Sequence, residues 1–95
     1  MPLQLSDNSL LISKAFINGQ WVDSHSGNKF AVTNPATGEV LAEVPDMDEV
    51  DTQLAIDAAD AAWADWRALP CKQKANLIRR WFDLVMENQE DLARL

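Results

Sequence analysis

The Asn18-Gly19 pair, with apolar residues on both sides, is the feature that most constrains how this chain folds. Both central positions of a type I′ turn require positive φ, and Asn followed by Gly is the pair that adopts these angles most readily. A two-residue turn at this point fixes the register of a β-hairpin, because it places Phe16 opposite Trp21. The sequence therefore predicts a short antiparallel ribbon with an aromatic pair on one face.

A second turn is predicted over residues 34–38, which read Asn-Pro-Ala-Thr-Gly. Proline fixes φ early in such a turn, and glycine supplies the left-handed position that closes it. The resulting hairpin pairs residues 29–34 with 39–44. Alternation along the strands is expected to place Phe30, Val32 and Leu41 on one face and Ala31, Val40, Ala42 and Val44 on the other. A ribbon that is apolar on both faces indicates that protein covers both sides.

Helices are predicted after the hairpins. Asp46 and Glu49 resemble a capping box, which starts a helix over about residues 47–65. Pro70 begins a second helix over 71–88, and Asn88 offers an N-cap to a third over 89–95. The fold class is therefore α+β: two hairpins over 15–44, an antiparallel helix pair and the start of a third helix. Residues 1–14 are expected to be a flexible N-terminal arm, and residues 15–95 an incomplete domain.

Length and charge exclude several classes of protein. A chain of 95 residues forms one domain at most, and its net charge of −7 predicts that it binds neither nucleic acid nor an anionic membrane surface. No apolar run approaches the roughly 18 to 20 residues of a membrane span, and no basic segment of a secretory signal is present, so a cytoplasmic protein is expected. One cysteine and one histidine exclude a disulfide framework and a histidine cluster.

Two residues invite a catalytic interpretation. Cys71 is placed at a helix N-terminus beside Lys72, which favours a reactive thiolate, but the sequence places no base to assist it. His25 lies in a loop among hydroxyl and amide side chains and is interpreted as a solvated histidine. The sequence therefore predicts no catalytic residue.

Carboxylates and tryptophans at helical spacing form two further sets. The carboxylates are interpreted as a solvated helix face, since no glycine-turned calcium loop surrounds them: Asp51, Asp57, Asp60 and Asp65. The tryptophans are interpreted as core packing: Trp63, Trp66 and Trp81. Since no phosphate-binding or metal-ligand motif is present, no cofactor-binding or metal-ligating residue is predicted.

The order of these motifs along the chain resembles that of a known protein family. Residues 16–21 read Phe-Ile-Asn-Gly-Gln-Trp, residues 34–39 read Asn-Pro-Ala-Thr-Gly-Glu, residues 55–59 read Ala-Ile-Asp-Ala-Ala, and Trp-Arg at 66–67 precedes a helix that ends Glu-Asp-Leu-Ala. Over residues 15–95 this order resembles the amino-terminal end of an NAD(P)-dependent aldehyde dehydrogenase. Residues 66–69 and 77–95 most resemble the succinate-semialdehyde dehydrogenase branch.

The resemblance implies an α/β oxidoreductase of which this chain is the leading scaffold. Family members oxidise an aldehyde through a thiolate, transfer hydride to NAD or NADP and hydrolyse the thioester with the help of a glutamate. Those motifs lie further along in the family, so Cys71 does not match the family cysteine, and NAD or NADP is a cofactor of the parent enzyme. The implied partners are the rest of the parent chain, a small aldehyde substrate and further copies in a homo-oligomer.

The sequence is compatible with a cation site and with a second class of function. Some family members hold a monovalent cation partly through backbone carbonyls at the positions of Val32 and Thr33, but that site also needs residues beyond Leu95. The alternative function is a small acidic α+β interaction module with no enzymatic role.

Overall fold

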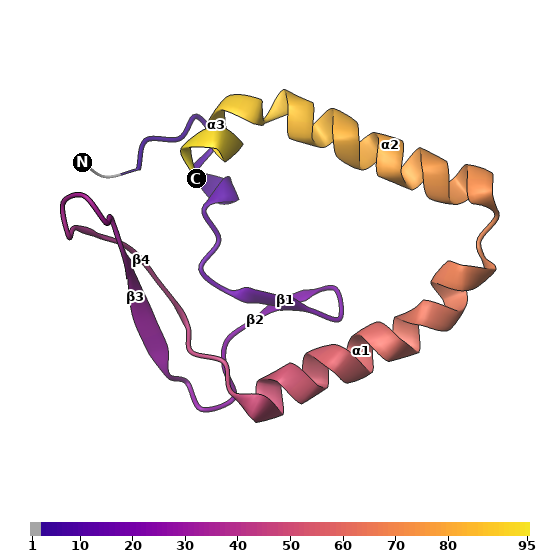
Figure 1. Ribbon diagram of the computed structural model, residues 1–95, viewed down its shortest axis with the longest axis horizontal. Helices are drawn as coiled ribbons and strands as arrows, with labels where there is room; N and C mark the ends of the chain where they lie inside the picture. Colours follow the sequence, from indigo (N-terminus) through magenta and orange to yellow (C-terminus); the bar gives the residue numbers. More distant parts are fainter. Residues whose placement is uncertain (1–2) are drawn as a thin grey trace. The chain divides into compact units, whose positions relative to one another are not determined.

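The computed structural model describes residues 3–95 and confirms the α+β class, with two small antiparallel sheets and three α-helices (Figure 1). In chain order the elements are η1 (Asn8–Leu10), β1 (Ala15–Ile17), β2 (Gln20–Val22), β3 (Lys29–Thr33), β4 (Val40–Pro45), α1 (Glu49–Ala68), α2 (Cys71–Glu87) and α3 (Gln89–Arg94). They fall into two compact units. One holds residues 12–62, and the other holds residues 3–11 together with 63–95.

The β1–β2 hairpin forms as the Asn-Gly pair predicts. Asn18 and Gly19 have φ values of 53° and 74°, so both central residues of the turn are in the left-handed region. Phe16 is paired with Trp21, and their ring centroids lie 4.9 Å apart with the planes tilted by 54°. This tilted contact is one of the geometries that aromatic pairs prefer, so the local turn and the cross-strand contact specify the same register.

Replacing Gly19 with valine is expected to destabilise this hairpin by about 1 kcal/mol or more, because a β-branched residue is poorly tolerated at positive φ. A β-carbon added at Gly19 has no atom within 4 Å, so the cost comes from the backbone and not from a clash. Denaturant unfolding followed by tryptophan fluorescence measures the change. Gly19→Asn is the matched control, since asparagine adopts positive φ more readily. Equal unfolding midpoints for the two variants would contradict the turn assignment.

The β3–β4 hairpin also forms, but its faces differ from the prediction. Phe30 is paired with Val44, and Val32 with Ala42. Directly paired residues project on the same side of a ribbon, so these four side chains share one face. The prediction that Ala42 and Val44 lie with Ala31 on the opposite face is therefore wrong.

A β-bulge explains the difference. The register shifts between Val32 and Thr33, and Thr33 is paired with Val40, so Leu41 is the extra residue on β4. An extra residue changes the alternation of all residues beyond it on its own strand. Nothing in the composition of this apolar strand marks the position of the bulge, which is why simple alternation assigns the wrong faces.

The helices differ from the predicted bounds mainly in α1. This helix begins at Glu49 and ends at Ala68, whereas the prediction was 47–65. It continues past residue 65 because no helix-breaking residue occurs before Pro70. The other two helices, α2 and α3, match the predicted ranges 71–88 and 89–95 to within one residue. No helix of residues 3–95 has the length and apolar character needed to cross a membrane.

The N-terminal arm predicted over residues 1–14 contains the short turn η1. The carboxylate of Asp7 accepts the backbone N–H of Ser9 and so caps this turn. Met1 and Pro2 lie outside the described residues. The flexibility of the arm stays a prediction.

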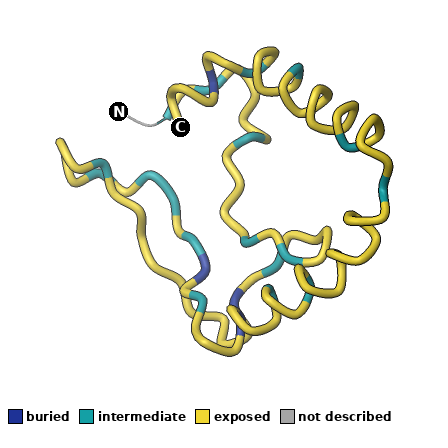
Figure 2. Tube along the Cα trace, turned by 45° about the vertical axis from the view of Figure 1, so that its right-hand side comes forward, coloured by how far each residue is buried: buried dark blue, intermediate teal, exposed yellow. Residues whose placement is uncertain are grey.

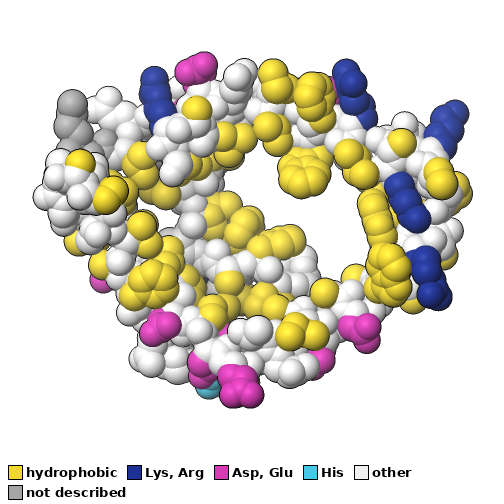
Figure 3. All heavy atoms as spheres, viewed as in Figure 1, with side chains coloured by type: hydrophobic (Ala, Val, Ile, Leu, Met, Phe, Trp, Pro, Cys, Tyr) yellow, Lys and Arg dark blue, Asp and Glu magenta, His cyan; other side chains and the backbone are white. Residues whose placement is uncertain are grey.

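The described residues have almost no apolar interior. Apart from Pro45, no apolar residue among 3–95 is buried, and large hydrophobic side chains on β3, α1 and α2 are exposed (Figures 2 and 3). The interpretation of Trp63, Trp66 and Trp81 as core residues is therefore wrong for this chain: all three are exposed, and Trp81 has 69% of its surface accessible. A helix or sheet face becomes a core only when a second layer covers it, and these residues supply no such layer.

Candidate functional site

The start of α1 is fixed by a reciprocal pair of carboxylates. Oδ1 of Asp48 accepts the backbone N–H groups of Val50 and Asp51, and Oδ2 of Asp51 accepts the backbone N–H of Asp48 at 3.3 Å. This is a capping box that lies two residues after the predicted one, so the assignment of Asp46 as the cap is wrong. The signal was present in the sequence, because Asp48 and Asp51 have the same spacing as Asp46 and Glu49.

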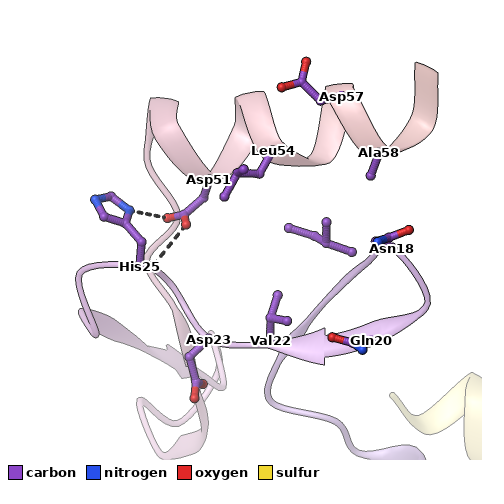
Figure 4. Close-up of a pocket in the computed structure, with 10 residues that line it drawn as sticks. Asn18, Gln20, Val22, Asp23, His25, Asp51, Leu54, Asp57 and Ala58 are labelled. Atoms are coloured by element: carbon purple, nitrogen blue, oxygen red, sulfur yellow. Dashed lines mark hydrogen bonds and ion pairs between the residues drawn. The ribbon is translucent and has the colours of Figure 1, made fainter. Parts of the chain in front are cut away.

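Asp51 also binds the loop that joins the two hairpins. Its Oδ1 accepts the backbone N–H of His25 at 3.0 Å, and its Oδ2 lies 3.2 Å from Nδ1 of the same residue (Figure 4). Nδ1 of His25 also lies 3.3 Å from Oδ1 of Asp48. The hydroxyl of Ser24 donates to the carbonyl of Asn28 at 2.9 Å and closes the loop on itself. The three residues His25, Asp48 and Asp51 form what is here called the loop clasp.

The loop clasp corrects two predictions. Asp51 is 4% exposed, so it does not belong to a solvated face with the other carboxylates of α1. The side chain of His25 is 44% exposed, but it contacts the carboxylates of Asp48 and Asp51, the second of which is 26 residues away, and not only the hydroxyl and amide groups of its own loop. No local pattern encodes a contact across that separation, so the sequence could not have revealed it.

Burial raises the pKa of Asp51, but the hydrogen bonds donated by the backbone and ring of His25, and by the backbone of Asp48, outweigh it and lower the pKa below its ordinary value. A carboxyl group with a lowered pKa in the folded state stabilises that state above its unfolded pKa and loses the contribution as pH falls through the folded value. The loop clasp is therefore strongest at neutral pH and weakens in acid.

A groove of about 530 Å³ lies beside the loop clasp, between the β1–β2 hairpin and the first turns of α1 (Figure 4). Ile17, Val22 and Leu54 supply apolar wall, and Asp23 and Asp57 lie among its polar lining. Both carboxylates have partners: Nζ of Lys14 lies 3.7 Å from Asp23, and the amide of Gln53 donates to Asp57 at 2.9 Å. The lining also includes His25 and Asp51 of the loop clasp, so the groove has apolar walls beside a hydrogen-bonded histidine–carboxylate pair.

The loop clasp offers three potential metal ligands, whose atoms lie within 4.8 Å of one another. Its chemistry favours a structural role. Both oxygens of Asp51 already accept backbone N–H groups from His25 and Asp48. The N-terminus of α1 also carries the positive end of the helix dipole, which repels a cation. The hydrogen bonds of the loop clasp thus fix the loop to the helix.

The remaining candidate residues lie apart from the loop clasp. Cys71 is exposed at the first position of α2. Nζ of Lys74 lies 5.9 Å from the centroid of the Trp66 ring, within the range of a cation–π contact. Val32 and Thr33 lie on β3, opposite the bulged residue Leu41 of β4.

Comparisons with known proteins give one consistent family. Residues 21–95 match the profile described as the aldehyde dehydrogenase family. Glutarate-semialdehyde dehydrogenase of Pseudomonas aeruginosa is 52% identical over 93 residues, which are 98% of this chain and 19% of that protein. The protein named succinate-semialdehyde dehydrogenase (NADP+) of Escherichia coli is 48% identical over the same shares.

Solved structures agree with these matches. The crystal structure of succinate-semialdehyde dehydrogenase from Burkholderia pseudomallei superposes with a TM-score of 0.90 at 49% identity, covering 94% of this chain and 18% of that one. The chain thus spans about a fifth of the length of the curated relatives that it matches.

Proposed function

Because the chain belongs to the aldehyde dehydrogenase family, we propose that it is the amino-terminal segment of a longer enzyme that oxidises an aldehyde to the corresponding acid with NAD or NADP. One observation carries this proposal: 98% of the chain aligns, at 52% identity, with only 19% of a full-length dehydrogenase. The near absence of a buried core in residues 3–95 supports it, since such a segment needs further protein to cover it.

The proposed substrate is the semialdehyde of a small dicarboxylic acid, and succinate semialdehyde is the first candidate. The two curated relatives are named for glutarate semialdehyde and succinate semialdehyde. Both molecules carry an aldehyde at one end and a carboxylate at the other. The name of the second relative specifies NADP, so NADP is tested beside NAD.

The role of this chain in the enzyme is structural. His25 is held by the two carboxylates of the loop clasp, and within residues 3–95 no base is hydrogen-bonded to the thiol of Cys71. We assign no catalytic, cofactor-binding or metal-ligating residue to it. Residues 1–14 form an arm, and residues 15–95 are the first part of a domain that later segments of an α/β enzyme complete. In that enzyme α1 and α2 pack as an antiparallel pair, and the enzyme is a cytoplasmic homo-oligomer.

Calorimetric titration of NAD and NADP into the 95-residue chain is expected to show no binding, because its sequence contains no phosphate-binding motif. The full-length protein is expected to reduce the nucleotide when succinate semialdehyde is added, which absorbance of NADH or NADPH follows. The product is expected to be the acid. Tight nucleotide binding by the short chain would show that part of the nucleotide site lies in these 95 residues, and the structural role proposed for them would be wrong. A full-length protein inert to a panel of aldehydes would favour the alternative, an acidic interaction module.

Cys71 provides the internal control of this experiment. Full-length Cys71→Ala is expected to keep its activity, while a thiol-alkylating reagent is expected to abolish the activity of the variant and of the unmodified protein alike, because the reactive thiol lies downstream of residue 95. Loss of activity in Cys71→Ala alone would overturn this assignment.

A further inference from the structure

Asp91 in α3 is one of three buried polar residues in the described chain, with 5% of its surface exposed. Its Oδ1 accepts the backbone N–H of Ser6 at 2.8 Å, and its Oδ2 accepts the backbone N–H of Asp7 at 2.9 Å. These partners lie 85 and 84 residues away in sequence. An ionised carboxylate that uses both oxygens on two consecutive N–H groups makes strong, directional hydrogen bonds.

Arg94 adds a complementary contact from the same helix. Its Nη1 donates to the backbone carbonyl of Gln4 at 3.0 Å. Asp91 and Arg94 are three positions apart, so they lie on one face of α3. This face therefore presents an acceptor for N–H groups and a donor for a carbonyl, and both contact main-chain atoms of the arm.

Whereas the backbone N–H of Asp7 binds Asp91, its side chain makes hydrogen bonds within η1. It accepts the backbone N–H of Ser9 at 3.0 Å and the hydroxyl of the same residue, which holds η1 together. A cavity of about 310 Å³ lies between the arm and α3, lined by Ser6, Asp7 and residues 86–91. Asp91 and Arg94 supply the polar contacts between the two segments beside this cavity.

We propose that Asp91 and Arg94 form a main-chain clamp that holds residues 4–7 of the N-terminal arm on α3 at neutral pH and releases them in acid. The clamp binds mainly the backbone of the arm, and the side chain of Ser6 adds a smaller hydrogen-bond contribution at Asp91. Under this proposal residues 4–7 are bound to α3 at neutral pH, whereas the sequence predicts a flexible arm. The clamp also stands independently of the enzymatic proposal, because all of its groups belong to this chain.

The direction of the pH dependence follows from the hydrogen bonds. The N–H groups of Ser6 and Asp7 lower the pKa of Asp91 below its ordinary value; burial opposes this shift, and the charge of Arg94 supports it. The other charged groups around the clamp are Glu87 and Glu90, which line the cavity with Asp7. Because the pKa is lowered on folding, the carboxylate stabilises the clamp fully above its ordinary value of 3.8, and this contribution is lost as pH falls through the still lower pKa of the folded state.

Hydrogen–deuterium exchange of the peptide covering residues 3–11, measured in the longest natural form of the protein, tests the clamp. At pH 7 the Asp91→Asn variant is expected to exchange the Ser6 and Asp7 amides about tenfold faster than the unmodified protein. Arg94→Ala is expected to accelerate exchange in the same peptide and leaves the carboxylate of Asp91 in place. Glu90→Gln is the matched control, since it removes one negative charge from the same helix but leaves the hydrogen bonds of Asp91 and Arg94 in place, and the Ser6 and Asp7 amides are expected to exchange at close to the rate of the unmodified protein.

The second part of the test measures the same exchange in acid. After correction for the chemical exchange rate at each pH, protection of residues 3–11 is expected to fall as pH drops below about 4 in the unmodified protein. In Asp91→Asn this pH dependence is expected to disappear. Fast exchange of these amides in the unmodified protein at pH 7, or equal protection in Asp91→Asn and Glu90→Gln, would overturn the clamp. If Asp91→Asn also loosens α3, its faster exchange does not by itself identify the clamp. In that case faster exchange in Arg94→Ala supports the clamp, and unchanged exchange in Arg94→Ala contradicts it. None of these measurements depends on dehydrogenase activity.

Discussion

Replacing Trp81 with alanine is expected to lower the free energy of unfolding of the full-length enzyme by about 3 to 5 kcal/mol, the range for truncating a buried tryptophan. In the 95-residue chain the same change is expected to alter that free energy by less than about 0.5 kcal/mol, as for an exposed residue. The difference arises because Trp81 is 69% exposed in this chain, whereas the proposed enzyme covers it with later segments. Denaturant titrations of both proteins, followed by circular dichroism, measure the two changes.

Lys72→Ala in the same helix is the control for this comparison. Lys72 is exposed, and truncating an exposed residue of this kind is expected to have a small effect in both proteins. If Trp81→Ala were as mild in the full-length enzyme as Lys72→Ala, the face of α2 that carries Trp81 would be exposed there too. The proposed covering of this helix would then be wrong.

The isolated 95-residue chain is expected to self-associate and to bind a dye that reports exposed apolar surface. Large hydrophobic residues on β3, α1 and α2 are exposed together, and soluble monomers rarely present contiguous apolar patches of more than a few hundred Å². Light scattering across a range of concentrations measures the association, and dye fluorescence measures the exposed surface.

The full-length enzyme is the comparison for this experiment, and it is expected to bind little of the dye per molecule because its own segments cover these faces. A compact monomer of the short chain at high concentration, with sharp cooperative unfolding, would show that it needs no covering protein. That result would also favour an autonomous interaction module over an enzyme segment.

Local turn chemistry made the hairpins predictable. Asn18 and Gly19 adopt positive φ as the pair predicts, and the pairing of Phe16 with Trp21 follows from the two-residue turn. The bulge beside Thr33 was not predictable in the same way. Apolar residues occupy both faces of that ribbon, so a shift of register leaves no contradiction in the sequence pattern.

The loop clasp and the contacts of Asp91 could not be predicted, for a different reason. Each joins a carboxylate on a helix to backbone groups of a segment 26 or more residues away. Composition marks Asp51 and Asp91 only as charged residues on helices, which are usually solvated. Their burial depends on donors that only the folded chain brings to them, and periodicity carries no information about such donors.

The lack of a buried apolar core in residues 3–95 has a consequence for the order of synthesis. In the proposed enzyme these residues leave the ribosome before the segments that cover them, and the chain matches only 19% of a relative's length, so most of the polypeptide follows at roughly 5 to 20 residues per second. For an interval on the order of tens of seconds the nascent chain can form hairpins and helices but cannot bury the faces of α1 and α2. Those faces are then available to chaperones that bind exposed apolar segments, and completion of the fold waits for the last covering strand or helix to be translated.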